Sequence, residues 1–255
     1  MINNTTLATA FYDIGRGKWS TYKRTVEDYL NYFKNVSRFP GNMVIYCDAS
    51  HRDLIAQIRP EGEKTRIIDV PFEQLEFYKR FFDRTKLVMD SEAFKKQIIH
   101  RDIPEMLFPE YNIINFNKAS FVIDAIKYFE TSVYGWVDFG FGHGRIDISE
   151  DTDLYERVTR GDKLYMGCLR QPVDQMLYHP WSYFSNEIFI TGSAFMGTKK
   201  SLHRFKELVS SVIDDSLNAN LIDDDQTIYN MAYLLEKQLF NLRQGDWFNQ
   251  FSKLQ

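Results

Sequence analysis

The sequence predicts an α/β protein whose sheet is flanked by helices within a single domain, residues 1–255. Two observations predict this fold. Short apolar runs rich in β-branched and aromatic residues alternate with stretches of helical period, which is typical of βαβ units. No repeat, low-complexity segment or Pro/Gly/Ser-rich linker divides the chain. We therefore expect one folded unit built around one core.

The predicted elements follow in chain order. Apolar runs predict strands over residues 7–12, 43–47, 66–70, 111–114, 133–138, 163–168 and 187–196. Apolar positions at helical spacing predict helices over residues 20–36 and 119–129. They also predict two amphipathic helices, whose apolar stripes run from 202 to 212 and from 228 to 239. Gly192 interrupts the last strand, so a bulge or a close backbone approach is expected there.

Charge and cysteine content narrow the class of protein. The 31 Lys and Arg residues are mixed along the chain with 35 Asp and Glu, which disfavours a nucleic-acid binder because such a protein needs a basic patch. Cys47 and Cys168 are too few and too far apart for a disulfide scaffold or a cysteine zinc site, and they fit a reducing compartment. With neither a signal peptide nor an apolar stretch of membrane-spanning length, we expect a cytoplasmic protein. Any membrane contact would be peripheral, through a surface patch or a partner.

Ligands of an open α/β sheet bind beyond the carboxyl ends of its strands, so the residues that follow each strand are the candidates. The first predicted strand is followed by Tyr12, Asp13 and a turn in which Gly15 permits a tight backbone path. Arg16 of this turn could meet phosphate oxygens, or the turn could simply carry solvated charges. Asp48, after the second strand, could accept a hydrogen bond from a nucleobase or a ribose, or it could cap a helix.

The segment from 133 to 144 is the most informative one. An apolar strand delivers Asp138 to the sheet edge, where three glycines are spaced by Phe141 and His143. A carboxylate at that position needs a cation or hydrogen-bond donors as partner. Mg²⁺ and Mn²⁺ prefer such oxygens and commonly bridge to phosphates, so Asp138 is a candidate metal ligand. The alternatives are a turn carboxylate bonded to nearby amides, and a structural role for His143.

Two further segments carry candidate site residues. Gly192 and Ser193 leave room beside the sheet for a sugar-sized group, or they allow close strand packing. The run from 223 to 226 opens a helix, and one of its acids can cap that helix. Asp224 and Asp225 are candidates for a general base, because neighbouring like charges raise one another's pKa, and Gln226 could bond a hydroxyl. The aromatic residues between 178 and 184 could stack on sugars, cover a site as a lid, or pack in the core.

Five segments together carry a family resemblance. They are AFYDIGRGKW from Ala10, YNIINFNKASFV from Tyr111, YGWVDFGFGHG from Tyr134, TGSAFMG from Thr191 and DDDQTIYN from Asp223. Their order is similar to that of GT-A glycosyltransferases. More narrowly, the chain resembles the HtrL/YibB family of bacterial proteins, which is associated with lipopolysaccharide and surface-polysaccharide biosynthesis. The resemblance spans nearly the whole sequence.

This resemblance implies a GT-A-like, Rossmann-like mixed sheet that binds a nucleotide-diphosphate-sugar, with a UDP-sugar as the expected donor. Residues 1–145 would bind the donor, and residues 146–255 would bind a glycan or lipid-linked glycan acceptor, at the inner face of the membrane. The implied donor-binding residues are Thr9, Tyr12 and Asp13 at the nucleoside, Asp48 at the base, Arg16 and Lys118 at the phosphates, and Asp138, Gly192, Ser193 and Gln226 nearby.

The resemblance also implies a metal and a mechanism. Asp138 matches the first Asp of the DxD motif that holds Mn²⁺ or Mg²⁺ on the diphosphate, but Gly140 stands where the second Asp belongs. A metal would then be held by Asp138, the diphosphate and His143, or be bound weakly or not at all. Transfer would invert the anomeric centre, with Asp225 or Asp224 as the base. A retaining route remains open if no carboxylate reaches the acceptor.

Two rival functions remain open at this stage. One is a non-catalytic protein of GT-A-like fold that binds a nucleotide-sugar or a glycan, which the missing second Asp favours. The other is a sugar nucleotidyltransferase, for which residues 15–18, GRGK, form a poor version of the expected glycine-rich loop.

Overall fold

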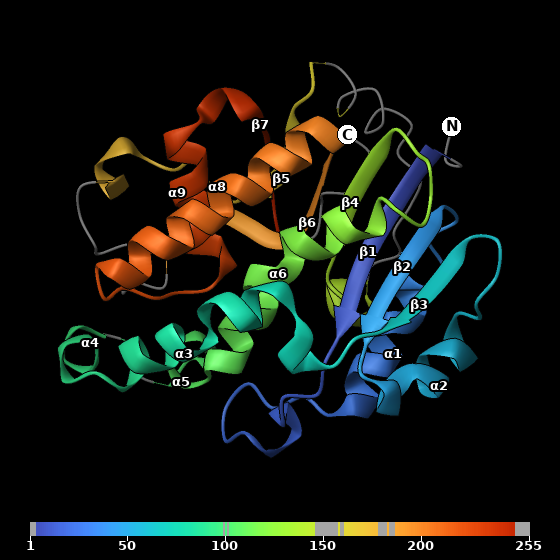
Figure 1. Cartoon of the computed structure of the whole chain (residues 1–255), viewed down its shortest axis with the longest axis horizontal. Coiled ribbons are helices and arrows are strands. Elements are labelled where there is room, and N and C mark those ends of the chain that lie inside the picture. The colour runs from blue at the N-terminus through green and yellow to red at the C-terminus, as the bar shows by residue number, and fades with distance from the viewer. Residues whose placement is uncertain are drawn as a thin grey trace.

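The structure, a computed structural model, describes residues 4–98, 100, 102–145, 158, 161–177, 183 and 187–247. Helices cover both faces of one mixed sheet (Figure 1). The strands are β1 (Thr5–Phe11), β2 (Asn42–Cys47), β3 (Thr65–Asp69), β4 (Val133–Val137), β5 (Leu164–Cys168), β6 (Ile190–Gly197) and β7 (Phe240–Gln244). The α-helices are α1 (Val26–Val36), α2 (Ala49–Ile58), α3 (Glu76–Asp90), α4 (Glu92–Gln97), α5 (Pro104–Leu107), α6 (Pro109–Ala125), α8 (Lys199–Asn218) and α9 (Asp225–Leu235).

The sheet has the order β3-β2-β1-β4-β6-β5-β7. Strands β3, β2, β1 and β4 are parallel, whereas β6 is antiparallel to both of its neighbours. The chain winds from β1 outward to β3 and then returns to the other side of β1 as β4. This reversal is a topological switch point, and in open α/β sheets ligands bind at such a point.

Each face of the sheet has its own hydrophobic core. Phe33 of α1 and Ile55 of α2 pack on one face. Phe116 of α6, Phe205 of α8 and Tyr229 of α9 pack on the other, where the larger cluster lies. Figure 1 shows α1 and α2 separated by the sheet from α6, α8 and α9. Much of the aromatic content of the chain is therefore core.

Helix boundaries follow local chemistry. Thr25 and Asp28 form a capping box, so α1 begins at Val26 and not at residue 20. Asp224 caps α9 by accepting from the Gln226 amide, as the acidic run predicted. Asp48 occupies the N-cap of α2 but makes no side-chain cap hydrogen bond.

The strand predicted over residues 111–114 is wrong, because these residues lie in the first half of α6. Pro109 stands in the first turn of this helix, where a missing amide hydrogen costs nothing. The helix is buried on almost all sides between β1, α3 and α8, so its apolar positions do not show a clear helical period. The buried run Tyr111–Ile114 therefore looks like a strand in the sequence.

The other predicted strands correspond to β1 through β6, with shifts at their ends. β7 was not predicted as a strand. The pairing of β5 with β6 is irregular between Met166 and Cys168, opposite the part of β6 that contains Gly192. The predicted irregularity at Gly192 is confirmed.

Replacing Gly135 with Ala tests how closely the central strands are packed. A Cβ at Gly135 would lie 2.5 Å from the Phe195 carbonyl oxygen and 2.6 Å from Met196 Cγ. We expect Gly135→Ala to lower the free energy of unfolding by about 1–3 kcal/mol, because overpacking a core costs that much. Gly62→Ala is the control, since nothing lies within 4 Å of its added Cβ. Equal urea midpoints for the two variants would contradict this packing.

Candidate functional site

Two adjoining cavities lie beyond the carboxyl ends of β1 and β4. They share seven lining residues, which are Arg16, Arg24, Tyr111, Asn115, Lys118, Asp138 and His143. We call the first the ring-lined cavity, because it is lined by five aromatic residues that do not line the second: Phe11, Tyr12, Tyr29, Trp136 and Phe139. We call the second the acid-lined cavity, because it is lined by three acidic residues that do not line the first: Glu105, Asp224 and Asp225.

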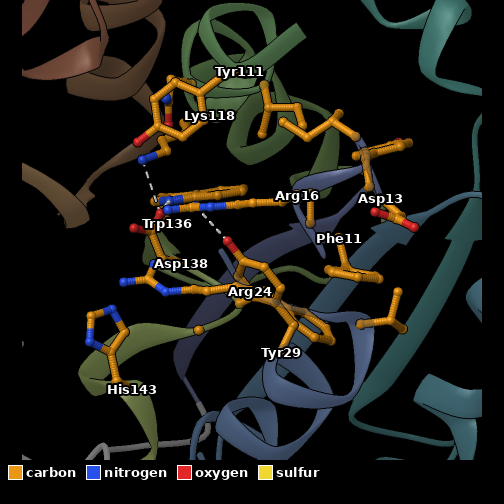
Figure 2. Close-up of a pocket in the computed structure, with 18 residues that line it drawn as sticks. Phe11, Asp13, Arg16, Arg24, Tyr29, Tyr111, Lys118, Trp136, Asp138 and His143 are labelled. Atoms are coloured by element: carbon orange, nitrogen blue, oxygen red, sulfur yellow. Dashed lines mark hydrogen bonds and ion pairs between the residues drawn. The ribbon is translucent and has the colours of Figure 1, made fainter. Parts of the chain in front are cut away.

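The ring-lined cavity combines aromatic surfaces with one carboxylate at the end of β1. Phe11 stacks on Phe139, with ring centroids 5.0 Å apart. Asp13 follows β1 and accepts from the Gly15 amide at 2.9 Å, which fixes the turn. Figure 2 shows Phe11 and Asp13 on one side of this cavity, and Asp138 and His143 on the other.

Arg16 lies between these two sides and is firmly held. Its Nε donates to the Tyr22 carbonyl at 3.0 Å, and one terminal nitrogen donates to the Tyr29 hydroxyl at 2.6 Å. Its guanidinium also lies over the rings of Trp19 and Tyr111, at 5.3 and 5.7 Å from their centroids. A guanidinium fixed in this way presents its charge to the cavity without losing much rotamer freedom on binding.

The residues shared by the two cavities are rich in positive charge. Burial lowers the pKa of His143, and Arg24, Arg145 and Arg16 lower it further because they disfavour a second positive charge. Arg145 also lines the acid-lined cavity. This part of the site is therefore suited to an anion.

Lys118 ties the site together. The residue is 4% exposed, and its ammonium lies 2.6 Å from Asp225 Oδ2, 3.0 Å from Asp138 Oδ1 and 3.1 Å from the Gly192 carbonyl oxygen. An ammonium group has three hydrogens, and these three acceptors use all of them. Asp138 and Asp225 raise the pKa of Lys118 above its usual value despite burial. Its expected contact with phosphate stays a prediction, because here Lys118 holds two carboxylates.

Gly192 is required by the position of Asp225. A Cβ at Gly192 would lie only 1.9 Å from Asp225 Oδ2. The space beside Gly192 is therefore occupied by a carboxylate of the protein. The sequence had predicted either room for a sugar or close strand packing there. Ser193 contributes its carbonyl, which accepts from the Asp138 amide at 2.8 Å.

The acid-lined cavity holds a buried group of carboxyls. Asp224 Oδ1 accepts from the Gln226 amide, and Oδ2 accepts from Gln226 Nε2 at 3.1 Å. Burial raises the pKa of Asp224, Asp225 and Glu105, and the neighbouring carboxylates raise it further. Lys118 acts in the opposite direction on Asp225 and favours its charged form.

The predicted metal ligands do not form a metal site by themselves. Asp138 Oδ1 already accepts from Trp136 Nε1 at 2.7 Å and from Lys118, and Gly140 supplies no second carboxylate. The arginines around His143 oppose a further cation there. Within the described ranges, no group of three or more His, Cys, Asp or Glu side chains could hold a metal ion. The donor set therefore does not fit a metal held by the protein alone.

Other predicted residues lie outside the two cavities or use their polar groups within the protein. Thr9 is fully buried inside β1 and is not among the lining residues of either. Asp48 is likewise absent from both linings, and burial raises its pKa while the Phe72 amide donates to it. Tyr12 lines the ring-lined cavity, but its hydroxyl donates to the Val70 carbonyl. Of the aromatic segment from 178 to 184, Tyr183 is buried and bonded to Ser216, and the others lie outside the described residues.

Several lining residues were not among the predicted ones. Two of them, Tyr111 and Asn115, share one helical face of α6 with the predicted Lys118, because the three follow one another at spacings of four and three. This signal was present in the sequence, but the predicted strand over residues 111–114 concealed it. Arg24 lies in the segment before α1 and Glu105 in the short helix α5, and their positions depend on tertiary contacts.

The fold and the position of this site define the class of the protein. The mixed sheet with its flanking helices has the GT-A fold, because the solved structures similar to this chain are glycosyltransferases of that fold. The chain belongs to the HtrL/YibB family, described as bacterial proteins of unknown function, whose model matches residues 3–255. Protein HtrL of Escherichia coli K12 is 28% identical over 270 residues, which cover 98% of this chain and 92% of the relative.

Three solved structures illustrate the likeness. The yeast mannosyltransferase Ktr4p in complex with GDP matches with a TM-score of 0.57 and 8% identity, over 97% of this chain and 70% of that one. Core-mannan synthase A of Aspergillus fumigatus, in its Mn/GDP form, matches with a TM-score of 0.52 and 10% identity, over 93% of this chain and 70% of that one. Mouse xyloside xylosyltransferase 1 matches with a TM-score of 0.50 and 12% identity, over 93% of this chain and 84% of that one. At these identities the likeness shows the fold alone.

None of the described helices is long and apolar enough to cross a membrane.

The buried carboxyls predict how stability depends on pH. Because their folded pKa values are raised, the folded state binds more protons than the unfolded state above about pH 4, so stability falls as pH rises through the raised values. We expect the free energy of unfolding to decrease with pH more steeply in the wild type than in Asp224→Asn, which keeps the helix cap, by up to about 1 kcal/mol per pH unit. Urea titrations between pH 5 and 8 measure this difference. The difference between the two proteins reports on the Asp224 carboxyl alone, because both contain His143, whose lowered pKa makes stability rise with pH. Parallel slopes would contradict it.

Proposed function

We propose that this protein is a glycosyltransferase that moves a sugar from a nucleotide-diphosphate-sugar to a glycan acceptor. One observation carries the proposal. Across the adjoining cavities, a ring-lined part, a part rich in arginine and an acid-lined part follow one another. A nucleoside, a diphosphate and a sugar follow one another in the same order in such a donor.

The nucleoside belongs in the ring-lined cavity. Phe11 and Tyr29 offer apolar surfaces on which a base or ribose can pack, and Asp13 offers a carboxylate to its hydroxyls. We propose a UDP-sugar as the donor. The GDP complexes of two fold neighbours make guanosine the alternative to test.

The diphosphate belongs beside the arginines. Arg16, Arg24 and Arg145 line the cavities and supply fixed positive charge against the charge that develops on the leaving group. One fold neighbour, core-mannan synthase A, is in an Mn/GDP form. In this chain the arginines provide that charge, so the mechanism contains no step through Mn²⁺ or Mg²⁺.

The acid-lined cavity is where transfer takes place. Asp225 accepts the proton of an acceptor hydroxyl, the hydroxyl oxygen bonds to the anomeric carbon, and the bond from that carbon to the diphosphate oxygen breaks. The nucleoside diphosphate leaves with the electron pair, and the anomeric centre inverts. Lys118 favours the ionised form of Asp225, which burial opposes, and the ionised form is the one that a base requires.

The acceptor is proposed to be a glycan or a lipid-linked glycan of a bacterial surface polysaccharide or lipopolysaccharide. Residues 146–255 would contribute most of its site, through Asp224, Asp225 and Gln226, and residues 1–145 most of the donor site. Work at the inner face of the membrane fits such an acceptor.

The role of the arginines in binding the diphosphate can be tested with UDP alone, without knowing which sugar is transferred. We expect Arg24→Gln to weaken UDP binding about tenfold, since a charge-assisted hydrogen bond contributes about 1.5–3 kcal/mol. Titration calorimetry in EDTA and in Mn²⁺ should give wild-type affinities within about twofold of each other. Lys23→Gln removes the same charge from an exposed neighbour outside both cavities, and it should bind like the wild type. Binding that is lost in EDTA would contradict the role given to the arginines.

Two variants test whether Asp225 or its neighbour Asp224 is the base. Asp225→Asn keeps the shape beside Lys118, so UDP should bind within about twofold of wild type while transfer falls by at least about a hundredfold, the typical contribution of a general base. Asp224→Asn should retain more transfer, because both Asp224 oxygens serve the start of α9. Release of UDP from a panel of UDP-sugars measures the rates. Equal losses of binding and transfer in Asp225→Asn would remove its assignment as the base.

A second candidate is a binding protein of the same fold without turnover. Gly140, at the position of the second metal-binding Asp, favours it. Binding of a nucleotide-sugar with no hydrolysis or transfer in that panel would select this candidate.

A further inference from the structure

The side chain of Asn115 is unusual in this site. The residue is 7% exposed, yet within the described part of the chain its amide nitrogen Nδ2 has no hydrogen-bond partner. A buried donor without a partner destabilises a protein, so such groups commonly serve a ligand. Asn115 lines both cavities and lies one turn before Lys118 on α6.

The acid-lined cavity, which Asn115 also lines, presents carboxyl groups that can form hydrogen bonds. Glu105, Asp224 and Asp225 line the acid-lined cavity, which has a volume of about 470 Å³. Lys118 also lines it, but Asp138, Asp225 and the Gly192 carbonyl use its three hydrogens. Hydroxyl groups suit this surface, because each one can donate to a carboxylate and accept from an amide.

A carboxylate on the sugar would be poorly placed in the acid-lined cavity. The other cations that line this cavity, Arg16, Arg24 and Arg145, surround His143 and serve the diphosphate in the proposed function. An anionic sugar would add charge beside Asp225, whose charged form Lys118 favours, and beside Glu105 and Asp224, whose raised pKa values indicate that this site already disfavours negative charge. Like charges in a buried site repel strongly.

We propose that the acid-lined cavity selects a donor whose sugar is neutral and hydroxylated, and that Asn115 Nδ2 donates to an oxygen of that sugar. A donor whose sugar carries a carboxylate is rejected. This inference rests on the proposed function and names the substrate class of the same site.

The test compares two donors that differ only at the sixth carbon of the sugar. Titration calorimetry of the full chain with UDP, UDP-glucose and UDP-glucuronate measures the nucleotide and the sugar separately. We expect UDP-glucose to bind at least about tenfold more tightly than UDP-glucuronate. If GDP is the nucleotide that binds, GDP-mannose and GDP-mannuronate form the equivalent pair.

Asn115→Leu tests the named residue. It should bind UDP like the wild type, lose about fivefold to tenfold in affinity for UDP-glucose, and unfold at the same urea concentration or a higher one. Ser120→Ala is the matched control, because Ser120 Oγ is a buried, unpartnered polar group on the same helix that lines neither cavity. It should leave both affinities unchanged.

Each outcome decides something different. Equal or tighter binding of UDP-glucuronate overturns the selection of neutral sugars while leaving the proposed function in place. A lower unfolding midpoint in Asn115→Leu, or unchanged affinity for UDP-glucose, overturns the role of Asn115. Failure of both UDP and GDP to bind overturns the proposed function, and this inference falls with it.

Discussion

The arrangement of the site depends on one buried ammonium. Lys118 bonds Asp138 after β4, the Gly192 carbonyl in β6 and Asp225 at the start of α9, so three elements that are far apart in sequence meet at one charge. Asp138 and the buried Asp225 would repel each other without it, and removing one partner of a buried ion pair is costly. Gly192 is a glycine because Asp225 occupies the space that its side chain would need.

Around this centre the site changes character from one end to the other. Rings line one part, arginines hold the middle, and carboxyls with an unpartnered amide line the rest. Because Lys118 is saturated, it contributes structure and electrostatic balance, while Arg16 and Arg24 present the charge that faces a ligand. In the proposed function, this gradient would allow one chain to hold an anionic diphosphate close to acidic groups that bind hydroxyls.

The prediction from sequence succeeded where local chemistry is decisive and failed where burial is complete. Strands with alternating or β-branched apolar residues were found, and so was the acidic cap of α9. Helix α6 was half missed because it is covered on nearly every side, which removes the apolar stripe that marks a helix. That error separated Tyr111 and Asn115 from Lys118, although the three share one face.

By itself the sequence determined the α/β class, the family and most of the segments that form the site, because strand patterns, glycine turns and acidic helix starts are local signals. Tertiary structure alone decided which of those residues meet. It turned Lys118 toward two aspartates, left Thr9 and Asp48 outside the cavities, and brought Arg24, Glu105 and Asn115 into them. The reason is physical: pairing of buried charges and satisfaction of hydrogen bonds depend on three-dimensional distances, which no spacing along the chain encodes.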